Sequence, residues 1–523
     1  MKNLRFPPEL TNPIGLRIFK PAASPPGGRP PKGDLTMISS LMLKGFQKTV
    51  FLLAALSLGL LLTLQPVFGQ YFGRNKVQYE KFDYRVLKTE HFDVYFYPEE
   101  EQATKVGARM AERWYKRFAR LFNYELRGRQ ALIMYASHPQ FEQTTVLSDI
   151  IGEGTGGVTE SMKRRIILPF GASLEETDHV IGHELVHAFQ YDMAAGQAQQ
   201  YSGQSMGGLE RAPLWVIEGM AEYLSIGPVD SNTAMWMRDV IKKKKMPTIK
   251  DLRDPYRYFP YRYGQAVWAY IGGRWGDLVV VKVMKDIVRG ADYEKAMERA
   301  LGINLKKLSE DWQAALKKDY SPYQQTTQPP TATGRLLVKG SEYDPYNVAP
   351  VLSPDGKKFV YISSRDLFSL DMFIGDAKTG KTTRRITRTS VDPHFQSIQF
   401  INSAGSWDMT GKQFVFGAVS AGKPVLALLD VEGQKISEEI KFPELGEILN
   451  PTWSPDGKKI AFSGLAGGYT DLYIYDLETK KLKNMTGDPY GDIHPVWSPD
   501  GRTIAFVTER FTTKLNEIGR AHV

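Results

Sequence analysis

Two histidines four residues apart are the clearest pair of chemistry-bearing residues in the chain. They bound the run His183-Glu184-Leu185-Val186-His187. On a helix, residues four apart lie one turn apart on the same face, so both imidazoles can bind one zinc ion. The glutamate between them is placed to act as a general base on a water molecule. The sequence therefore predicts a Zn²⁺ site on a helix, with Glu184 as the catalytic base.

A second apolar helix is predicted to supply a third ligand. The segment from Trp215 to Tyr223 is apolar except for two carboxylates. Glu218 lies 31 residues after His187, and Glu222 follows one turn later on the same face. Because a carboxylate in an apolar segment is costly unless it is paired or binds a metal, Glu218 fits as the third ligand. Glu222 fits as the acceptor of a histidine N–H beside the metal. The alternative is a pair of surface glutamates on an amphipathic helix.

The elements that must position these residues alternate between strand and helix patterns. Most of 173–317 has helical spacing, and the capping-box pattern from Ser173 to Glu176 marks the start of the histidine helix. Shorter elements are expected before it, as strands at 92–96, 131–135 and 165–168 and a helix over 103–122. We therefore expect an α+β domain over residues 71–320.

These motifs resemble those of a known family. With Gly156–Glu160 and Ile166–Phe170, they are similar to the gluzincin metallopeptidases of the peptidase-MA-like superfamily, over residues 85–320. The resemblance implies a zincin-like fold, zinc on the two histidines and Glu218, and peptide-bond hydrolysis with Glu184 as base. It also implies that the strand over 165–170 is the edge on which an extended peptide substrate pairs.

The same resemblance nominates a downstream tyrosine. Pro260 to Ala266 is similar to the aminopeptidase motif Pro-Tyr-x-x-Gly-x-Ala, which makes Tyr261 the candidate for stabilising the oxyanion. Tyr263 is the alternative, and either could simply be an interfacial aromatic with a solvated hydroxyl. The main departure from the family is the polar, Gly/Gln-rich segment 191–212, expected to be an inserted loop that gates the cleft.

The second half of the chain is repetitive. The run Trp-Ser-Pro-Asp-Gly at 453–457 recurs at 497–501, with a Leu-Ser-Pro-Asp-Gly copy at 352–356 and a degenerate copy at 406–412. Pro, Asp and Gly in this order predict a type I turn between two strands, and the spacing predicts one propeller blade per copy. The repeats resemble the TolB-like β-propeller family over 336–516. About four blades suggest a truncated, all-β propeller, joined to the first domain by a polar linker at 321–335.

Composition and the chain ends limit the remaining possibilities. The chain has no cysteine, which excludes cysteine catalysis and disulfide scaffolds. Much of the net charge of +9 lies in residues 1–69, so no nucleic-acid partner is inferred. Within that leader, Met42–Gly69 has the basic start and apolar run of a secretory signal peptide, so no stable membrane span is expected after its cleavage. Residues 517–523 are what a sequencing adapter would encode, and are expected to be a non-native tail.

The resulting expectation is an exported zinc-dependent peptidase, in the periplasm or outside the cell. Its partners would be a peptide or protein substrate and, through the propeller, a cell-envelope protein. The alternative is an envelope binding or scaffold protein that acts through the propeller and carries a structural or inactive zinc domain. The run Gly203 to Gly207 matches a serine nucleophile elbow, but it lacks the flanking strand and helix that this chemistry requires.

Overall fold

The computed structural model describes residues 76–510, which belong to one compact unit. Positions 149, 201–207, 341–345, 367–368, 390–393, 400 and 402–403 are excepted. The predicted signal peptide, the tail 517–523 and the Gly203–Gly207 motif lie outside the described residues. Among the helices of the described residues, none has the length and apolar character needed to cross a membrane.

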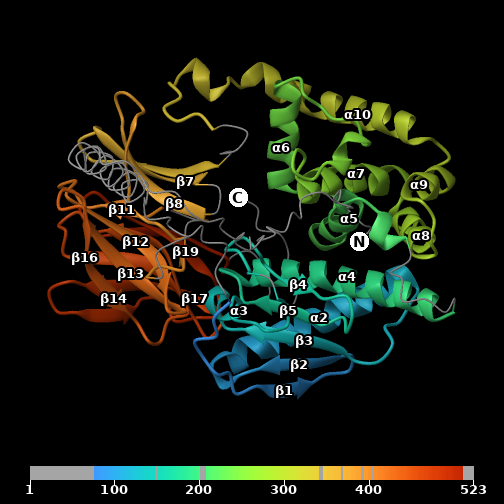
Figure 1. The fold of residues 1–523 in the computed structure, drawn as a ribbon, viewed down its shortest axis with the longest axis horizontal. Helices are drawn as coiled ribbons and strands as arrows, with labels where there is room; N and C mark the ends of the chain where they lie inside the picture. The colour runs from blue at the N-terminus through green and yellow to red at the C-terminus, as the bar shows by residue number, and fades with distance from the viewer. Residues whose placement is uncertain are drawn as a thin grey trace, which may run out of the picture. The chain divides into compact units, whose positions relative to one another are not determined.

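A mixed five-stranded sheet forms the first layer of the N-terminal half (Figure 1). Its order is β1-β2-β3-β5-β4, in which the three central strands are parallel and the two edge strands pair antiparallel. The strands are β1 (Arg85–Lys88), β2 (Phe92–Phe96), β3 (Gln130–Tyr135), β4 (Val158–Thr159) and β5 (Ile166–Pro169). The three strands predicted from the sequence are therefore confirmed to within one residue at each end, whereas β1 and β4 were not anticipated.

The edge of this sheet is not the strand predicted from the sequence. Residues 165–170 were expected to form the edge, but β5 has neighbours on both sides. Val158 and Thr159 of β4 pair antiparallel with Ile167 and Ile166. Two residues are too few to show a period-two pattern, which is why β4 could not be predicted from the sequence. A substrate strand that extended this sheet would therefore meet β4 first.

Helices cover the sheet and make up the rest of this half. Helix α2 packs on β2, and α4 packs on both β5 and α5. The helices are α2 (Glu101–Phe122), α3 (His138–Phe141), α4 (Leu174–Gln200), α5 (Leu214–Ile226), α6 (Ser231–Lys242), α7 (Pro260–Trp275), α8 (Asp277–Val288), α9 (Tyr293–Leu301) and α10 (Leu305–Thr326), with short 3₁₀ turns η1 (Pro98–Glu100), η2 (Leu209–Arg211), η3 (Asp251–Arg253) and η4 (Pro330–Ala332).

Two segments predicted as irregular are partly helical. Helix α4 continues through 191–200, the first half of the expected gating loop, since alanine and glutamine there are good helix formers. Helix α10 likewise runs six residues into the expected linker at 321–335, even though it includes Pro322. Polar composition alone does not distinguish a helix from a loop at either place.

Glycines allow the helices of this half to approach closely. A Cβ on Gly219 of α5 would lie 2.3 Å from the Cα of Gly264 in α7, far inside normal contact. A Cβ on Gly182 of α4 would lie 2.7 Å from the Trp114 ring of α2. The two crossings fix α5 against α7 and α4 against α2. They lie next to Glu218 and His183, so they also fix the backbone that carries those residues.

The described part of the second half forms four antiparallel sheets, as expected for propeller blades. Three have a four-strand path, β6-β7-β8-β9, β10-β12-β13-β14 (with β11 also on β12) and β15-β16-β17-β18, and the last contains β19 and β20. Their strands are β6 (Asn347–Leu352), β7 (Lys358–Asp366), β8 (Ser369–Asp376), β9 (Thr382–Arg385), β10 (Ser397–Ile398), β11 (Ser406–Trp407), β12 (Gln413–Ser420), β13 (Lys423–Asp430), β14 (Lys435–Lys441), β15 (Glu447–Trp453), β16 (Lys459–Ala466), β17 (Tyr469–Asp476), β18 (Lys481–Asn484), β19 (Asp492–Trp497) and β20 (Ile504–Thr508).

The repeated Ser-Pro-Asp-Gly runs form the predicted turns. In the copy between β15 and β16, the Ser454 hydroxyl donates to Asp456, whose carboxylate accepts from the Lys458 N–H at 3.1 Å. Gly457 has φ +73°, a conformation that favours glycine. At two copies the tryptophan before the turn also links neighbouring sheets: the Trp407 indole N–H donates to the Val351 carbonyl at 3.1 Å, and the Trp497 indole N–H donates to the Thr452 carbonyl at 3.2 Å. The repeat thus specifies the hairpin, and at these two copies its tryptophan adds a contact between sheets.

Loops of the propeller contact the N-terminal half directly. Gly446 and Gly468 approach so closely that an added Cβ would lie 2.6 Å from the Cβ atoms of Ser137 and Ala103. Glu509, just after β20, accepts hydrogen bonds from the backbone N–H groups of Leu174 and Glu175 at 3.2 and 3.4 Å. A carboxylate at a helix N-terminus is stabilised by unpaired N–H groups and the helix dipole. The propeller therefore supplies part of the cap of α4.

Candidate metal centre

Helix α4 brings the two predicted histidine ligands together. The Nε2 atoms of His183 and His187 lie 3.2 Å apart, and both side chains are buried. The helix begins as its sequence predicts, with the Ser173 hydroxyl accepting from the Glu176 N–H. In a simple capping box the Glu176 carboxylate would accept from the Ser173 N–H, whereas here it accepts from the Ala172 N–H. The four-residue spacing then turns both imidazoles to one side of α4.

Helix α5 adds the carboxylate expected as the third ligand. Oε2 of Glu218 lies 3.2 Å from Nε2 of His183 and 3.2 Å from Nε2 of His187. Glu218 can reach this position because the next residue, Gly219, lets α5 cross tightly over Gly264 of α7. The three residues thus present three ligand atoms around one point.

The outward-facing nitrogens of the histidines have their own partners. His183 Nδ1 lies 3.1 Å from Oε1 of Glu222, and His187 Nδ1 lies 2.9 Å from Oε1 of Gln190. A carboxylate or amide oxygen can only accept here, so in the neutral imidazoles Nδ1 carries the proton, which is the form that can bind a metal through Nε2. Carboxylate and carbonyl acceptors of this kind orient metal-binding histidines in other proteins.

Glu222 is itself held by an arginine and a further histidine. The Arg262 guanidinium lies 3.0 Å from its Oε2, and His179 Nε2 lies 3.3 Å from its Oε1. Burial would raise the pKa of Glu222, but hydrogen bonds from His179 and His183 outweigh burial and hold the pKa well below its usual range. Glu222 is therefore an ionised acceptor beside the His183 ring.

The charges of the cluster suit a cation. Burial alone would lower the pKa of His183, but hydrogen bonds to Glu218 and Glu222 outweigh burial and raise it to about 10. Burial would raise the pKa of Glu218, yet the charge of His187 and hydrogen bonds from both histidines hold it well below its usual range. Without a metal the cluster therefore retains protons between its ligand atoms. Two imidazoles and one carboxylate are a common ligand set for zinc, so the residues fit a Zn²⁺ ion with one position left open.

Glu184, the predicted base, lies between this cluster and the edge strand. Its Oε2 accepts from the Thr159 hydroxyl at 2.7 Å, and the same hydroxyl is 2.9 Å from the Glu184 carbonyl. Gly157, just before β4, leaves the room that Glu184 needs, because a Cβ there would lie 3.1 Å from the glutamate Cγ. The strand that ends the sheet therefore fixes the carboxylate of the candidate base.

The structure distinguishes the two candidate tyrosines. The ring of Tyr261 stacks on the His183 ring with centroids 5.8 Å apart. Burial, followed by the charges of Glu218 and Glu184, raises the pKa of Tyr261, so its hydroxyl remains a neutral donor. Tyr263 is buried instead among Tyr258 and Trp236. Tyr261 therefore contacts the cluster, and Tyr263 packs in an aromatic group on α7.

Several members of the site were not identified from the sequence. Thr159 holds the Glu184 carboxylate, Gln190 holds the His187 ring, and Arg262 holds the Glu222 carboxylate. Gln190 has a recognisable position, one turn after His187 on α4. Arg262 and Thr159 come from other elements, and only the tertiary fold shows which partners they meet.

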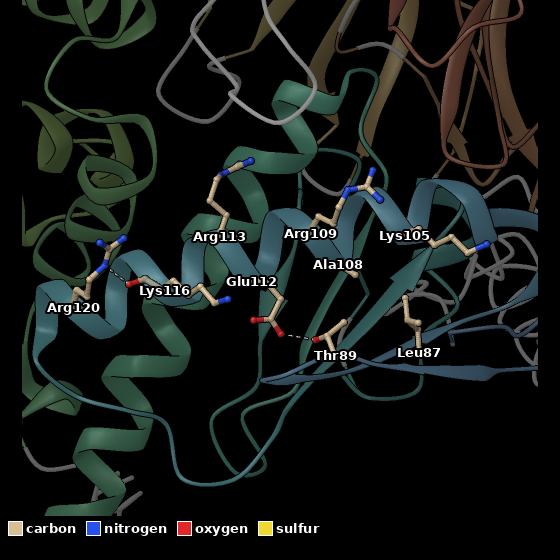
Figure 2. A pocket seen from close by; sticks show the side chains of 9 residues that line it. All are labelled: Leu87, Thr89, Lys105, Ala108, Arg109, Glu112, Arg113, Lys116 and Arg120. Atoms are coloured by element: carbon tan, nitrogen blue, oxygen red, sulfur yellow. Dashed lines mark hydrogen bonds between the residues drawn. The ribbon is translucent and has the colours of Figure 1, made fainter.

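A separate cavity of about 630 Å³ lies on the outer face of α2, and none of its lining residues belongs to the metal centre. Figure 2 shows basic side chains along this face of the helix and the Thr89–Glu112 hydrogen bond at its floor. Lys105, Arg113 and Lys116 each pair with an acidic side chain, Glu101, Asp178 and Glu90. Paired cations on an exposed helix face are typical of a solvated surface.

Comparisons with known proteins identify the second half. Residues 395–514 match the family model described as PD40, TolB beta propeller domain, so a TolB-like propeller is confirmed within the predicted 336–516 segment. No curated protein matches the chain.

Similar solved structures include TolB proteins. One, assigned as TolB from Agrobacterium tumefaciens, has 19% identity and a TM-score of 0.26, covering 32% of this chain and 54% of its own. TolB from Acinetobacter baumannii has 19% identity and a TM-score of 0.28, covering 39% and 57%. The hydrazine synthase of Kuenenia stuttgartiensis has 14% identity and a TM-score of 0.26, covering 31% and 49%. The chain thus spans about half the length of each.

Proposed function

We propose that the N-terminal half is a zinc-dependent peptidase of the gluzincin type, appended to a TolB-like propeller. The observation that carries the proposal is the convergence of His183, His187 and Glu218, with three ligand atoms facing one point. The candidate base Glu184 is held beside them by a hydroxyl of the edge strand. A structural zinc site would need four closed protein ligands, whereas the described residues offer three here, with the candidate base Glu184 beside them.

Each residue has a role in hydrolysis. A bound Zn²⁺ would supply Lewis-acid chemistry, polarising a scissile carbonyl and acidifying water. Glu184 accepts the proton of the attacking water and delivers it to the leaving amine. Tyr261 donates its phenolic hydrogen bond to the oxygen on which negative charge develops. Thr159 keeps the Glu184 carboxylate in place, and Glu222 fixes the His183 ring.

The substrate class follows from the edge of the sheet. Strand β4 ends the sheet and its Thr159 contacts Glu184, so an extended peptide that paired with β4 would pass beside the base. Backbone pairing is independent of side chains, which suits a peptide or protein substrate. The signal-peptide pattern at Met42–Gly69 supports export, to the periplasm or the medium.

The test uses the purified chain without its signal peptide. Zinc content is measured by mass spectrometry and cleavage with a mixed library of quenched fluorescent peptides. We expect one zinc associated with His183 and His187, and cleavage that falls by about 10²–10⁴-fold in Glu184→Gln while that zinc is retained. His187→Ala should lose this zinc and the activity together. Glu310→Gln, an exposed glutamate on α10, is the matched control and should behave as wild type. A zinc-loaded wild type that cleaves no peptide, or a fully active Glu184→Gln, would contradict the proposal.

A second candidate function rests on the PD40 match at 395–514. In this alternative the chain is a cell-envelope protein that binds a protein partner through its propeller, and the zinc domain is structural or inactive. Cross-linking in cells distinguishes the two functions. Partner capture that persists in Glu184→Gln, together with no peptide cleavage by the wild type, would favour the binding role.

A further inference from the structure

A second histidine–carboxylate cluster lies away from the first, where the N-terminal half meets the propeller. His138, Glu142 and Glu153 each offer one ligand atom, and these atoms all lie within 4.8 Å of one another. His138 is the first residue of α3, and Glu142 follows four residues later, one helical turn away. Nδ1 of His138 lies 3.3 Å from Oε1 of Glu142. The proposed peptidase mechanism uses none of the three.

The histidine of this cluster has a defined orientation. Its Nε2 lies 3.2 Å from the Thr155 carbonyl, which can only accept a hydrogen bond. Nε2 therefore carries the proton of the neutral imidazole, and Nδ1 presents a lone pair. Nδ1 is buried and has no hydrogen-bond partner among the described residues. A carboxylate oxygen of Glu142 lies 3.3 Å from Nδ1, so two lone pairs face each other unless a cation or a proton lies between them.

The propeller adds a further carboxylate at the same place. Oε1 of Glu447, at the start of β15, accepts from the His138 backbone N–H at 2.6 Å, and Glu447 is only 8% exposed. Gly446 before it packs so closely on Ser137 that a side chain there would clash. One imidazole and three carboxylates thus meet at a tight junction between residues more than three hundred positions apart.

Burying so many carboxylates is unfavourable without compensating positive charge. A divalent cation at this place supplies that charge and a partner for the buried Nδ1 as well.

We propose that His138, Glu142 and Glu153, with Glu447 beside them, form a second divalent-metal site that fastens the propeller to the N-terminal half. One imidazole with several carboxylates suits Mn²⁺ or Zn²⁺, whereas Mg²⁺ and Ca²⁺ prefer sites made only of oxygen ligands. The three ligands come from the N-terminal half, and the propeller supplies the supporting carboxylate of Glu447. This second site is independent of the peptidase function, because it involves neither the same ligands nor a reaction.

The experiment counts metal ions in the full mature chain. The protein is stripped with a chelator, dialysed against excess Zn²⁺ or Mn²⁺, and analysed by mass spectrometry. We expect two ions per chain in the wild type, one in His138→Gln and one in His187→Ala, and none in the double variant. His494→Gln, a histidine of β19 outside both clusters, is the matched control and should keep two.

Two further measurements keep the test independent of folding. Circular dichroism checks that His138→Gln is folded, and Glu153→Gln, which preserves side-chain volume, repeats the loss without removing the imidazole. Glu447→Gln should weaken the second ion by about 10-fold or more, since losing a supporting carboxylate typically costs 10–100-fold in affinity. If His138→Gln and Glu153→Gln both bind as many ions as the wild type, there is no second site. A wild type that binds one ion, removed only by His187→Ala, would likewise exclude the second site and leave the first intact.

Discussion

Adding a single methyl group where α5 crosses α7 should disrupt the metal centre. In Gly219→Ala the new Cβ would lie 2.3 Å from the Cα of Gly264, whereas carbon atoms normally rest about 3.5–4.0 Å apart. The helices must therefore separate by roughly 1 Å, and Glu218, the adjacent residue, moves with α5. Overpacking of this kind costs about 1–3 kcal/mol of stability. A displacement of about 1 Å in a positioned group can cost about 10²-fold in rate.

The matched control lies on the same helix pair. Gly273 of α7 has open space where its Cβ would be, so Gly273→Ala should stabilise the protein by about 0.5–1 kcal/mol, as alanine does in a helix interior. Urea unfolding measures both changes, and competition with a chromophoric chelator measures zinc affinity. We expect Gly219→Ala to lower the free energy of unfolding and to weaken zinc binding at His183 and His187. Wild-type zinc affinity in a folded Gly219→Ala would mean that this crossing does not position Glu218.

Three more outcomes follow from the contacts. Glu222→Gln should weaken zinc binding by about 10–100-fold, because the His183 ring loses an ionised acceptor; chelator competition measures this loss. Tyr261→Phe should lower kcat by about 10²–10³-fold with zinc retained, whereas Tyr263→Phe should not, as steady-state peptide assays would show. Burial raises the pKa of Glu100 from 4.5 to about 9. The contribution of its neutral carboxyl to stability is therefore complete below pH 4.5 and is lost as the pH rises through 9. The free energy of unfolding should be lower at pH 9 than at pH 5, and Glu100→Gln should reduce that difference.

Local patterns identified the elements whose residues are close in sequence. His183 and His187 lie one turn apart whatever surrounds them, so the helix and the face they share could be predicted from spacing alone. The Ser-Pro-Asp-Gly turns were predictable for the same reason, since Ser454, Asp456 and Gly457 interact only with their own hairpin. The zinc-binding role of His183 and His187 and the catalytic role of Glu184 remain predictions.

Features that depend on distant partners could not be predicted. Strand β4 forms the edge because Val158 and Thr159 pair with β5, and two residues are too few to show a periodic pattern. Arg262 was adjacent to the nominated tyrosine, yet its role depends on the crossing that places it against Glu222. The polar composition of 191–212 predicts a loop, whereas its alanine and glutamine residues favour the helix that α4 continues through residue 200.

The contact between Glu509 and the start of α4 has a consequence for the order in which the protein folds. The glutamate is made 335 residues after Leu174, whose N–H it accepts. At the usual synthesis rate of about 5–20 residues per second, that interval is on the order of tens of seconds. During this time the first turn of the histidine helix lacks one of its caps. The final stability of that turn is therefore acquired only once the chain has been made as far as the residues after β20, which delays completion of the histidine helix until the propeller strands exist.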